Sequence, residues 1–378
     1  MPKNILFVDH AAAVGGAEAF LLSLGKHLNQ ERWQLHLACP EGTLAEDAKN
    51  HFIVHPVTLP RLRRSPFFLF NWFASAMTLA RLARENKAEV IYGNTVRGSI
   101  YAALAARITG LPFIWHMQDF WLSENRPRFV RVDRLGKQLL LKTASRVIAN
   151  SRATAAQLPR STKVRIHYYG IDVETFVPTM DKATFCKQQN IPPNVPILGM
   201  VGRLRPWKGQ ARFIRAMQHV SSVLPDARFL IVGGDIFDVP DQYEQSLKRM
   251  PGELGLSERV IFTGHLGDVR PAMAAMDVFV HPGDPEPFGL VNIEAMAMGK
   301  PVVAFGHGAL PEIVVNGETG WLVPPGDEYA LAEATLTLLR DPARSTKMGQ
   351  AGRKRVEEKF TIYRKVVEMD KLLARVVE

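Results

Sequence analysis

At residues 281–302 the chain reads His281-Pro-Gly-Asp-Pro-Glu286-Pro-Phe-Gly-Leu-Val-Asn-Ile-Glu294-Ala-Met-Ala-Met-Gly-Lys-Pro-Val302. Asp277–His281 is typical of a strand that runs into a Pro/Gly loop, and Leu290–Met298 is typical of the helix that follows. The amides of residues 288–290 would then lie at a helix N-terminus, which favours phosphate. Glu286 precedes that place and Glu294 lies more than a turn beyond it. A ligand with hydroxyls on both sides of a phosphate would fit, and a nucleotide-sugar has that shape.

The composition is that of an ordinary globular protein with enough residues for two domains. The chain has 378 residues, of which 47% are hydrophobic and 22% are charged, so it can bury two cores of Rossmann size. Two cysteines, Cys39 and Cys186, form neither a disulfide framework nor a Cys-based zinc site, which favours a reducing cytoplasm. The first ten residues predict a strand and not a signal peptide.

The net charge of +10 is unevenly distributed. Residues 1–170 hold 23 Lys and Arg against 11 Asp and Glu, whereas residues 171–378 hold 24 against 26. This asymmetry indicates an anionic partner for the first half, such as a membrane surface, an anionic acceptor or nucleic acid. A merely soluble basic surface is the alternative. Nucleic acid is disfavoured because the basic residues carry no recognised RNA- or DNA-binding motif.

Short apolar runs alternate with longer helical segments, which predicts parallel sheets with helices on both faces. In the first half the predicted strands are Ile5–Val8, Gln34–Ala38, Val90–Tyr92, Phe113–Trp115 and Arg146–Ala149, with helices such as Ala17–Asn29 and Tyr101–Thr109. After Pro178 the predicted strands are Ile197–Val201, Arg228–Val232, Val260–Thr263, Val278–His281, Pro301–Ala304 and Gly320–Val323. The sequence therefore predicts two doubly wound domains joined near Gly170–Pro178.

Ligands of parallel sheets bind beyond the carboxyl ends of the strands. Arg203 and Lys208 follow one predicted strand, and a guanidinium and an ammonium five residues apart suit a pyrophosphate. No Gly-x-Gly-x-x-Gly follows a strand, which disfavours a dinucleotide oxidoreductase. Asp-x-Asp is absent and the histidines lack zinc-ligand spacing, so we expect no metal and no cofactor apart from a nucleotide-sugar co-substrate.

The segment around Glu286 and Glu294 resembles the Glu-x7-Glu signature of retaining glycosyltransferases of family 4, which have the GT-B fold. Four further blocks occur in the family's order: Gly15-Gly16-Ala17-Glu18, Ala149-Asn150-Ser151, Gly202-Arg203-Leu204-Arg205-Pro206-Trp207-Lys208-Gly209 and Asn316-Gly317-Glu318-Thr319-Gly320-Trp321-Leu322-Val323. This resemblance covers nearly the whole chain. It implies an α/β protein of two doubly wound, Rossmann-like domains that face a central cleft. Residues 1–172 would bind the acceptor, with a helix at 362–378 crossing back to them, and residues 173–361 would bind the donor.

The resemblance also implies roles for particular residues. Arg203 and Lys208 would clamp the leaving diphosphate, Glu286 would bind donor-sugar hydroxyls and Glu294 the ribose hydroxyls. His116 would touch the donor sugar and contribute to catalysis, although a satisfied structural histidine is the alternative. Glu18 reads as a first-turn helix charge. The remaining residues expected to bind the donor are Gly15, Gly16, Gly233, Gly234, Pro287, Phe288, Gly289 and Leu290.

The implied reaction is metal-independent transfer of a sugar from a UDP- or GDP-sugar to a glycan or lipid-linked acceptor, with retention. In the family, retention is attributed to front-face attack, in which a diphosphate oxygen accepts the acceptor's proton. Two departures affect substrate details: Tyr169-Gly170-Ile171-Asp172 stands where the family often has Asn-Gly-Val-Asp, and Gly308-Ala309 where it has Gly-Gly. A UDP-sugar epimerase of related fold and a non-catalytic nucleotide-sugar binding module are the competing hypotheses.

A stretch of sixteen uncharged residues, Ser65–Ala80, lies between Arg64 and Arg81. It is shorter than the ~20 apolar residues of a spanning helix. Arg61, Arg63 and Arg64 together with Phe67, Phe68 and Trp72 could instead hold the N-terminal domain on an anionic membrane. A helix packed in the core is the equal alternative. We therefore expect a cytoplasmic protein, with peripheral membrane attachment as the hypothesis to test.

Overall fold

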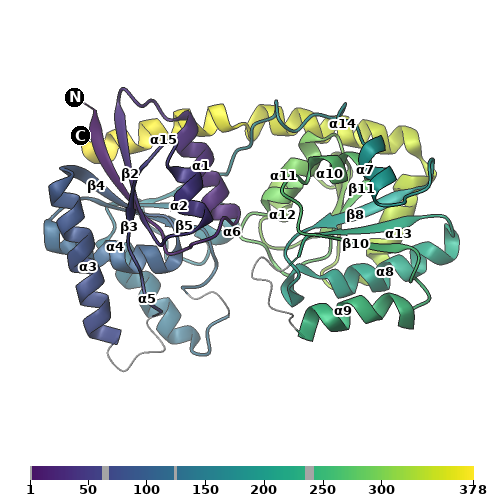
Figure 1. The fold of residues 1–378 in the computed structure, drawn as a ribbon, viewed down its shortest axis with the longest axis horizontal. Coiled ribbons are helices and arrows are strands. Elements are labelled where there is room, and N and C mark those ends of the chain that lie inside the picture. Colours follow the sequence, from purple (N-terminus) through teal and green to yellow (C-terminus); the bar gives the residue numbers. More distant parts are fainter. Residues whose placement is uncertain (1, 62–67, 123–125, 235–241) are drawn as a thin grey trace. The chain divides into compact units, whose positions relative to one another are not determined.

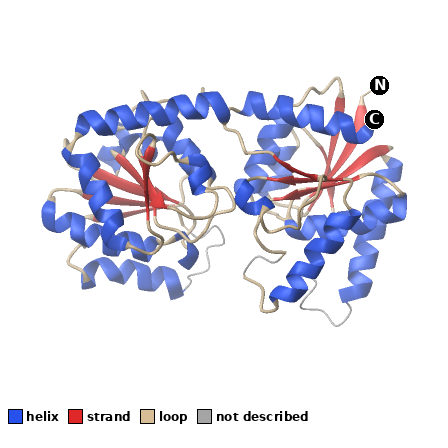
Figure 2. Cartoon of the chain, turned by 180° about the vertical axis from the view of Figure 1, so that it is seen from behind, coloured by secondary structure: helices blue, strands red, loops and turns tan. Residues whose placement is uncertain are grey.

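The computed structural model describes residues 2–61, 68–122, 126–234 and 242–378. The chain divides into two compact units: unit 1 comprises Met1–Ile171 and Ile362–Glu378, and unit 2 comprises Asp172–Thr361. Within each unit the strands form one sheet with helices on both sides of it, as the cartoon in Figure 2 shows. No helix among the described residues combines the length and the apolar character that crossing a bilayer requires.

The sheet of unit 1 has seven described strands in the order β3-β2-β1-β4-β5-β6-β7, and every pair is parallel. Its central strands are near-continuous apolar runs because helices cover both faces. The strands are β1 (Lys3–Val8), β2 (Trp33–Cys39), β3 (Ile53–Pro56), β4 (Ala88–Gly93), β5 (Phe113–Met117), β6 (Arg146–Ala149) and β7 (Val164–Ile166). The two edge strands β3 and β7 were not predicted, since their exposed residues break the apolar run.

The helices of unit 1 are α1 (Gly16–His27), α2 (Thr43–Ala48), α3 (Phe68–Glu85), α4 (Val96–Thr109), α5 (Val130–Thr143), α6 (Arg152–Ala155) and α15 (Ile362–Val377). The C-terminal helix α15 packs against α1 within this unit (Figure 1). Trp33 Nε1 donates to Asp370 Oδ1 at 2.5 Å, and His167 Nε2 bonds the Lys365 carbonyl at 2.9 Å. These buried or half-buried contacts attach the end of the chain to its first 171 residues.

Unit 2 repeats the architecture with six described parallel strands in the order β10-β9-β8-β11-β12-β13. The strands are β8 (Ile197–Val201), β9 (Arg228–Val232), β10 (Val260–Gly264), β11 (Val278–His281), β12 (Val302–Phe305) and β13 (Gly320–Val323). Its helices are α7 (Ala183–Gln188), α8 (Gln210–Val223), α9 (Gln242–Glu253), α10 (Arg270–Ala275), α11 (Leu290–Ala297), α12 (Leu310–Ile313), α13 (Glu328–Arg340) and α14 (Pro342–Lys359), with a 3-10 turn at Pro206–Lys208.

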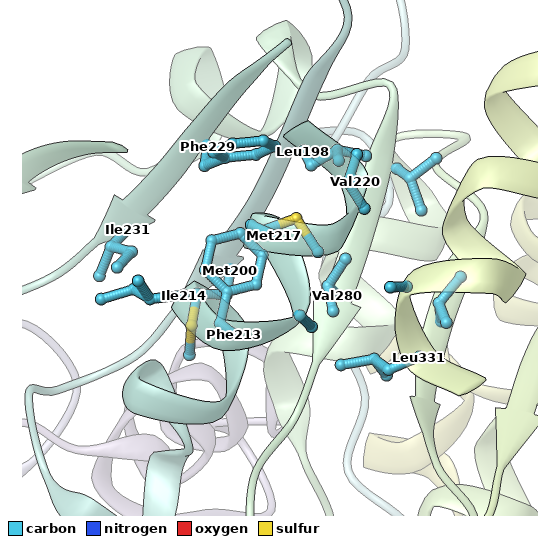
Figure 3. Packing of buried hydrophobic residues seen from close by; sticks show 14 of the residues in the cluster. Leu198, Met200, Phe213, Ile214, Met217, Val220, Phe229, Ile231, Val280 and Leu331 are labelled. Atoms are coloured by element: carbon cyan, nitrogen blue, oxygen red, sulfur yellow. The ribbon is translucent and has the colours of Figure 1, made fainter. Parts of the chain in front are cut away.

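The core of unit 2 lies between the sheet and helices α8 and α13. Figure 3 shows Phe213 and Met217 of α8 close to Met200 of β8, and Leu331 comes from α13. All four side chains are buried. Complete burial of such a side chain contributes about 1.5–3 kcal/mol, so this core holds β8 and β11 in register. The loops that follow these two neighbouring strands carry the residues of the candidate site.

Candidate functional site

The loops after β8 and β11 lie against each other because the two strands are neighbours in the sheet. The amide of Asp284 donates to the Trp207 carbonyl at 2.7 Å. Gly209 has a φ of +81°, and a Cβ there would stand 2.2 Å from the Pro282 carbonyl oxygen. Only glycine therefore fits at position 209. This close approach brings the end of the Arg203–Lys208 loop to the start of the Glu286 loop.

Lys208 Nζ forms an ion pair with Glu286 Oε1, and both groups are largely buried. Burial opposes ionisation of Glu286, but the ammonium of Lys208, followed by His281 and then Arg203, outweighs it and holds the pKa of the carboxyl below its usual value. Arg203 itself is exposed, while its backbone carbonyl accepts a 2.8 Å bond from Gln210 Nε2. The structure thus brings together two of the predicted residues and places the third within their electrostatic reach.

Helix α11 begins at Leu290, directly after Gly289 with a φ of +90°. Its first-turn amides lack partners within the helix, as at any helix N-terminus. Phe288 is buried and its ring lies edge-on to Phe360 with centroids 6.1 Å apart. A Cβ at Gly308 would lie 2.6 Å from the Glu286 carbonyl oxygen. Gly308, the glycine of the pair that differs from the family's Gly-Gly, therefore allows its backbone to lie close to the Glu286 loop.

Glu294 lies on α11, half-buried. Its carboxyl makes no side-chain hydrogen bond or ion pair with any residue in the described parts of the chain. Burial raises its pKa to about 7. A carboxyl in this state has unused capacity to accept hydrogen bonds from hydroxyl groups.

Gly233 and Gly234 follow β9, as predicted, and contacts within the chain explain why position 233 is a glycine. Its φ is +134°, and a Cβ would stand 2.2 Å from the Gly202 carbonyl oxygen. At Gly234 a Cβ would lie 3.0 Å from the His265 amide nitrogen. Close approach of the neighbouring backbone therefore accounts for both glycines, independently of any nucleotide.

In unit 1, His116 lies near the carboxyl end of β5 and is 1% exposed. The Tyr92 hydroxyl bonds its Nδ1 at 2.9 Å, and the rings of Phe20 and Tyr169 pack edge-on against it. Burial and then the charge of His167 lower its pKa well below the usual range. Its Nε2 has no hydrogen-bond partner among the described residues. A purely structural role for His116 thus accounts for the hydrogen bond of Nδ1, but it gives Nε2 no partner among the described residues.

Gly15 and Gly16 lie at the start of α1, where Gly15 is the residue before the helix. The Gly15 amide donates to Glu18 Oε2 at 2.9 Å, so Glu18 lies in the first turn, as predicted, and also caps the helix. Burial, reinforced by Asp9, raises the pKa of Glu18 to about 8. A Cβ at Gly16 would meet no atom within 4 Å in the part of the chain that the structure describes, so packing of those residues does not require glycine there.

A buried polar cluster at the carboxyl ends of β1, β4 and β5 was missed by the sequence analysis. Asp9 accepts from Asn94 Nδ2 at 2.6 Å and Thr95 Oγ1 at 3.1 Å. Gln118 Nε2 donates to Asn94 Oδ1 at 2.9 Å, and Gln118 Oε1 accepts from the Tyr169 hydroxyl. Asp9, Asn94 and Gln118 lie far apart in the sequence. The only feature of the sequence that could have indicated them is that each comes shortly after a predicted strand.

Two of the family blocks form hydrogen bonds that stabilise local structure within their own units. Ser151 caps α6 by accepting the Thr154 amide at 2.9 Å, and Asn150 Oδ1 accepts from the Thr154 hydroxyl at 2.8 Å. In the other block, Asn316 Oδ1 accepts the Leu322 amide at 2.9 Å across the turn before β13. Both blocks therefore stabilise turns and helix ends. Within the described ranges, no three His, Cys, Asp or Glu side chains are grouped so that they could hold a metal ion.

Two doubly wound parallel units with charged side chains and a helix N-terminus at their strand ends define an α/β protein of the GT-B class. The crystal structure of Anabaena Alr3699/HepE in complex with UDP and glucose superposes with a TM-score of 0.86 and 28% identity, covering 98% of this chain and 99% of that one. The family model "Glycosyltransferase Family 4" matches residues 14–175, and "Glycosyl transferases group 1" matches residues 181–355. The chain belongs to family 4 of the glycosyltransferases.

Two mannosyltransferase relatives match over part of their length. The GDP-mannose-dependent alpha-(1-6)-phosphatidylinositol monomannoside mannosyltransferase of Mycolicibacterium smegmatis is 38% identical over 193 residues, 49% of each chain. The lipopolysaccharide core biosynthesis mannosyltransferase LpsB of Rhizobium meliloti is 34% identical over 227 residues, 60% of this chain and 64% of the relative. The matched part of the chain thus spans about half to two thirds of these relatives.

Proposed function

We propose that this chain transfers a sugar from a UDP- or GDP-sugar to a hydroxyl of a glycan or lipid-linked acceptor, with retention, in the synthesis of a cell-surface polysaccharide or glycolipid. The observation that carries the proposal is the placement of Lys208 on Glu286 in unit 2, beside the N-terminus of α11. The names of the mannosyltransferase relatives and the UDP and glucose in the HepE crystals support a nucleotide-sugar donor and a glycolipid acceptor.

In the proposed mechanism the cations act on the leaving group. Breaking the bond between sugar and diphosphate moves negative charge onto the diphosphate, and fixed donors aimed at that charge stabilise the transition state. Arg203, Lys208 and the first-turn amides of α11 would supply these donors. Glu286 would accept hydrogen bonds from the donor sugar, and Glu294 from the ribose. A diphosphate oxygen would accept the acceptor's proton during front-face attack.

Roles in unit 1 are part of the same proposal. Residues 1–171 would bind the acceptor, while Gly15 and Gly16 would let backbone approach the donor. His116 Nε2, buried and without a partner among the described residues, would contact the donor sugar as a neutral ring, because its lowered pKa disfavours the charged form. Substrate would have to reach a nitrogen that the surrounding aromatic rings enclose.

The test is to incubate the protein with UDP-glucose or GDP-mannose and an extract of bacterial glycolipids, and to analyse both nucleotide and sugar products. Release of UDP or GDP together with a new glycolipid would support transfer. Conversion of the donor to another UDP-sugar would indicate an epimerase. Donor binding without turnover, read as a thermal shift, would indicate a binding module, since a ligand at 100 times its dissociation constant stabilises a protein by about 2.7 kcal/mol.

We predict that activity persists in excess EDTA. Arg203, Lys208 and the α11 N-terminus would neutralise the diphosphate, a task that a divalent ion performs in metal-dependent enzymes. The measurement is the initial rate of donor consumption in EDTA, in added magnesium and in added manganese. Complete loss in EDTA that either ion restores would contradict metal independence and leave the transfer proposal intact.

We propose that unit 1 attaches peripherally to an anionic membrane on the cytoplasmic side. Residues 62–67, including Arg63, Arg64 and Phe67, lie outside the described residues. The expected insertion of Trp72 is wrong, because this side chain packs against the core of unit 1. Helix α3 has features of both a core helix and a membrane-facing helix. One side is buried through Ala76, Leu79 and Ala80, whereas a stripe on it is exposed, formed by Phe70, Phe73 and Met77.

Helix α5 gives the membrane hypothesis stronger support than the segment that first suggested it. Its exposed side carries apolar residues three or four positions apart between cations. Asp133 is the one acid in residues 126–143, and it is buried against Lys137 Nζ at 2.7 Å. Both α3 and α5 pack on α4. The exposed residues of this face are Arg128 and Phe129, just before the helix, and Arg131, Val132, Arg134, Leu135, Gln138 and Leu139 on it.

We predict that the protein cosediments with phosphatidylglycerol vesicles at low salt and that Leu135→Glu with Leu139→Glu abolishes this binding. Each Arg near an anionic surface contributes about 1 kcal/mol, and two glutamates remove both apolar contact and attraction. Val367→Glu, at an exposed position of α15, is the matched control. High salt should weaken binding. Equal, negligible sedimentation with anionic and neutral vesicles would leave α3 as a core helix and favour a soluble acceptor.

A further inference from the structure

His281 is the last residue of β11 and is buried, and nothing in the proposed mechanism uses it. Asn292, fully buried in the first turn of α11, determines the state of its ring. Asn292 Nδ2 lies 3.0 Å from the Gly289 carbonyl oxygen and 3.2 Å from His281 Nδ1. A carbonyl only accepts, so the amide nitrogen faces it and donates to His281 Nδ1 as well. The proton of the neutral ring must therefore sit on Nε2.

That Nε2–H group has no hydrogen-bond partner among the described residues. It lies close to Glu286, with Nε2 3.7 Å from Oε1, the same oxygen that Lys208 binds. Burial, only partly offset by the charge of Glu286, lowers the pKa of His281 to about 4. At neutral pH the ring is accordingly an uncharged donor close to a carboxylate that is already paired.

A second donor beside Glu286 becomes important when Lys208 changes partner. The ammonium that neutralises Glu286 in the free chain is the same group that would act on the diphosphate of a bound donor. An ionised carboxylate left buried without a partner is costly, and it would tend to take up a proton or turn away. A donor that needs to move less than 1 Å could replace the lost bond, because 3.7 Å exceeds hydrogen-bond length by about that much.

We propose that His281 is a positioning residue: its Nε2–H takes over Glu286 Oε1 when Lys208 turns to the diphosphate, and it keeps the carboxylate ionised and aimed at the donor sugar. The role rests on the proposed function. Asn292 would act behind it by holding the tautomer that carries the proton on Nε2. The geometry thus assigns to β11 and the first turn of α11 a relay in which Gly289, Asn292, His281 and Glu286 are linked in that order.

The experiment compares His281→Phe and His281→Gln with the wild-type protein, using UDP with UDP-glucose and GDP with GDP-mannose as ligand pairs. Loss of a hydrogen bond to a charged group should lower donor turnover by roughly tenfold to a hundredfold in His281→Phe. Affinity for the free nucleoside diphosphate should stay unchanged, because Glu286 would contact only the sugar. Gln places an N–H donor at a similar distance from the backbone and should restore part of the turnover.

His219→Phe, on α8 and paired with Glu333 rather than with the site, is the matched control and should behave as wild type. If His281→Phe does not fold, His281→Asn, which is polar but too short to reach Glu286, should show the same selective loss. Wild-type turnover in His281→Phe and His281→Asn would overturn the inference. So would equal losses of affinity for the free diphosphate and for the intact donor in these variants. If the wild-type protein itself binds no nucleotide-sugar, the proposed function fails instead.

Discussion

Replacing Arg203 or Lys208 by alanine should lower sugar transfer by roughly a hundredfold or more, because each change removes a positive charge aimed at the departing diphosphate. The two variants should differ in stability. Arg203 is exposed, so its removal should leave folding unaffected. Lys208 is the ion-pair partner of the largely buried Glu286. A neutral donor such as His281 can replace the lost hydrogen bond but not the lost positive charge, so removing Lys208 should destabilise the fold. We therefore expect Lys208→Ala to melt at a lower temperature than Arg203→Ala.

The measurements are initial rates with the accepted donor and thermal unfolding of each variant without ligand. Lys208→Ala combined with Glu286→Gln removes both charges and should recover most of the melting temperature while remaining inactive. Arg212→Ala, which removes a surface ion pair with Asp284, is a nearby control that should retain turnover. A correctly folded Arg203→Ala/Lys208→Ala protein with wild-type rates would exclude these residues as the leaving-group clamp.

Substitutions of Glu286 and Glu294 should separate recognition of the donor sugar from recognition of the ribose. We expect Glu294→Ala to weaken both the free nucleoside diphosphate and the intact donor by tenfold or more, since each lost hydrogen bond to a charged group is worth about 1.5–3 kcal/mol. Glu286→Ala should weaken only the intact donor. Calorimetric titration of both ligands into both variants provides the comparison, and Glu286→Gln distinguishes loss of charge from loss of the side chain.

Two results would contradict these assignments. Equal losses of diphosphate and donor affinity in Glu286→Ala would mean that the sugar lies elsewhere, and unchanged diphosphate affinity in Glu294→Ala would place the ribose away from α11. The pKa of Glu294 near 7 adds a pH test. Because a raised pKa in the folded state favours the protonated form, stability from this group is lost progressively as the pH rises from 4.5, the ordinary value, to about 7. Glu294→Gln should therefore melt higher than the wild-type protein at pH 8 and similarly at pH 5.

Much of the fold could be predicted because the information is local. Central strands buried on both faces are continuous apolar runs, and the predicted bounds of β8, β9 and β11 match those of the structure. The edge strand β3 lacks that signal: it has exposed residues at both ends, and it was missed for this reason. The Glu-x7-Glu segment was equally readable, since its strand, loop and helix are consecutive in the chain.

The pairing of side chains within the site was not predictable, because it depends on strand order. Lys208 and Glu286 are 78 residues apart, and they meet only because β8 and β11 are neighbours in the sheet. The same holds for His116, because the Tyr92 hydroxyl and the aromatic rings that surround it come from other elements of unit 1. No pattern along the chain indicates which residues will surround a given strand end.

The sequence by itself determined the class of protein and the positions of its cations and carboxylates, because motif spacing along a strand, loop and helix survives without knowledge of the fold. Only the tertiary structure decided how those groups act on one another. Burial sets the pKa of Glu294, and the amide of Asn292 places the proton of His281. The closeness of the Gly209 backbone to Pro282 brings Lys208 to Glu286. Desolvation and hydrogen-bond partners are properties of packed neighbours, and those neighbours come from elements far apart in the chain.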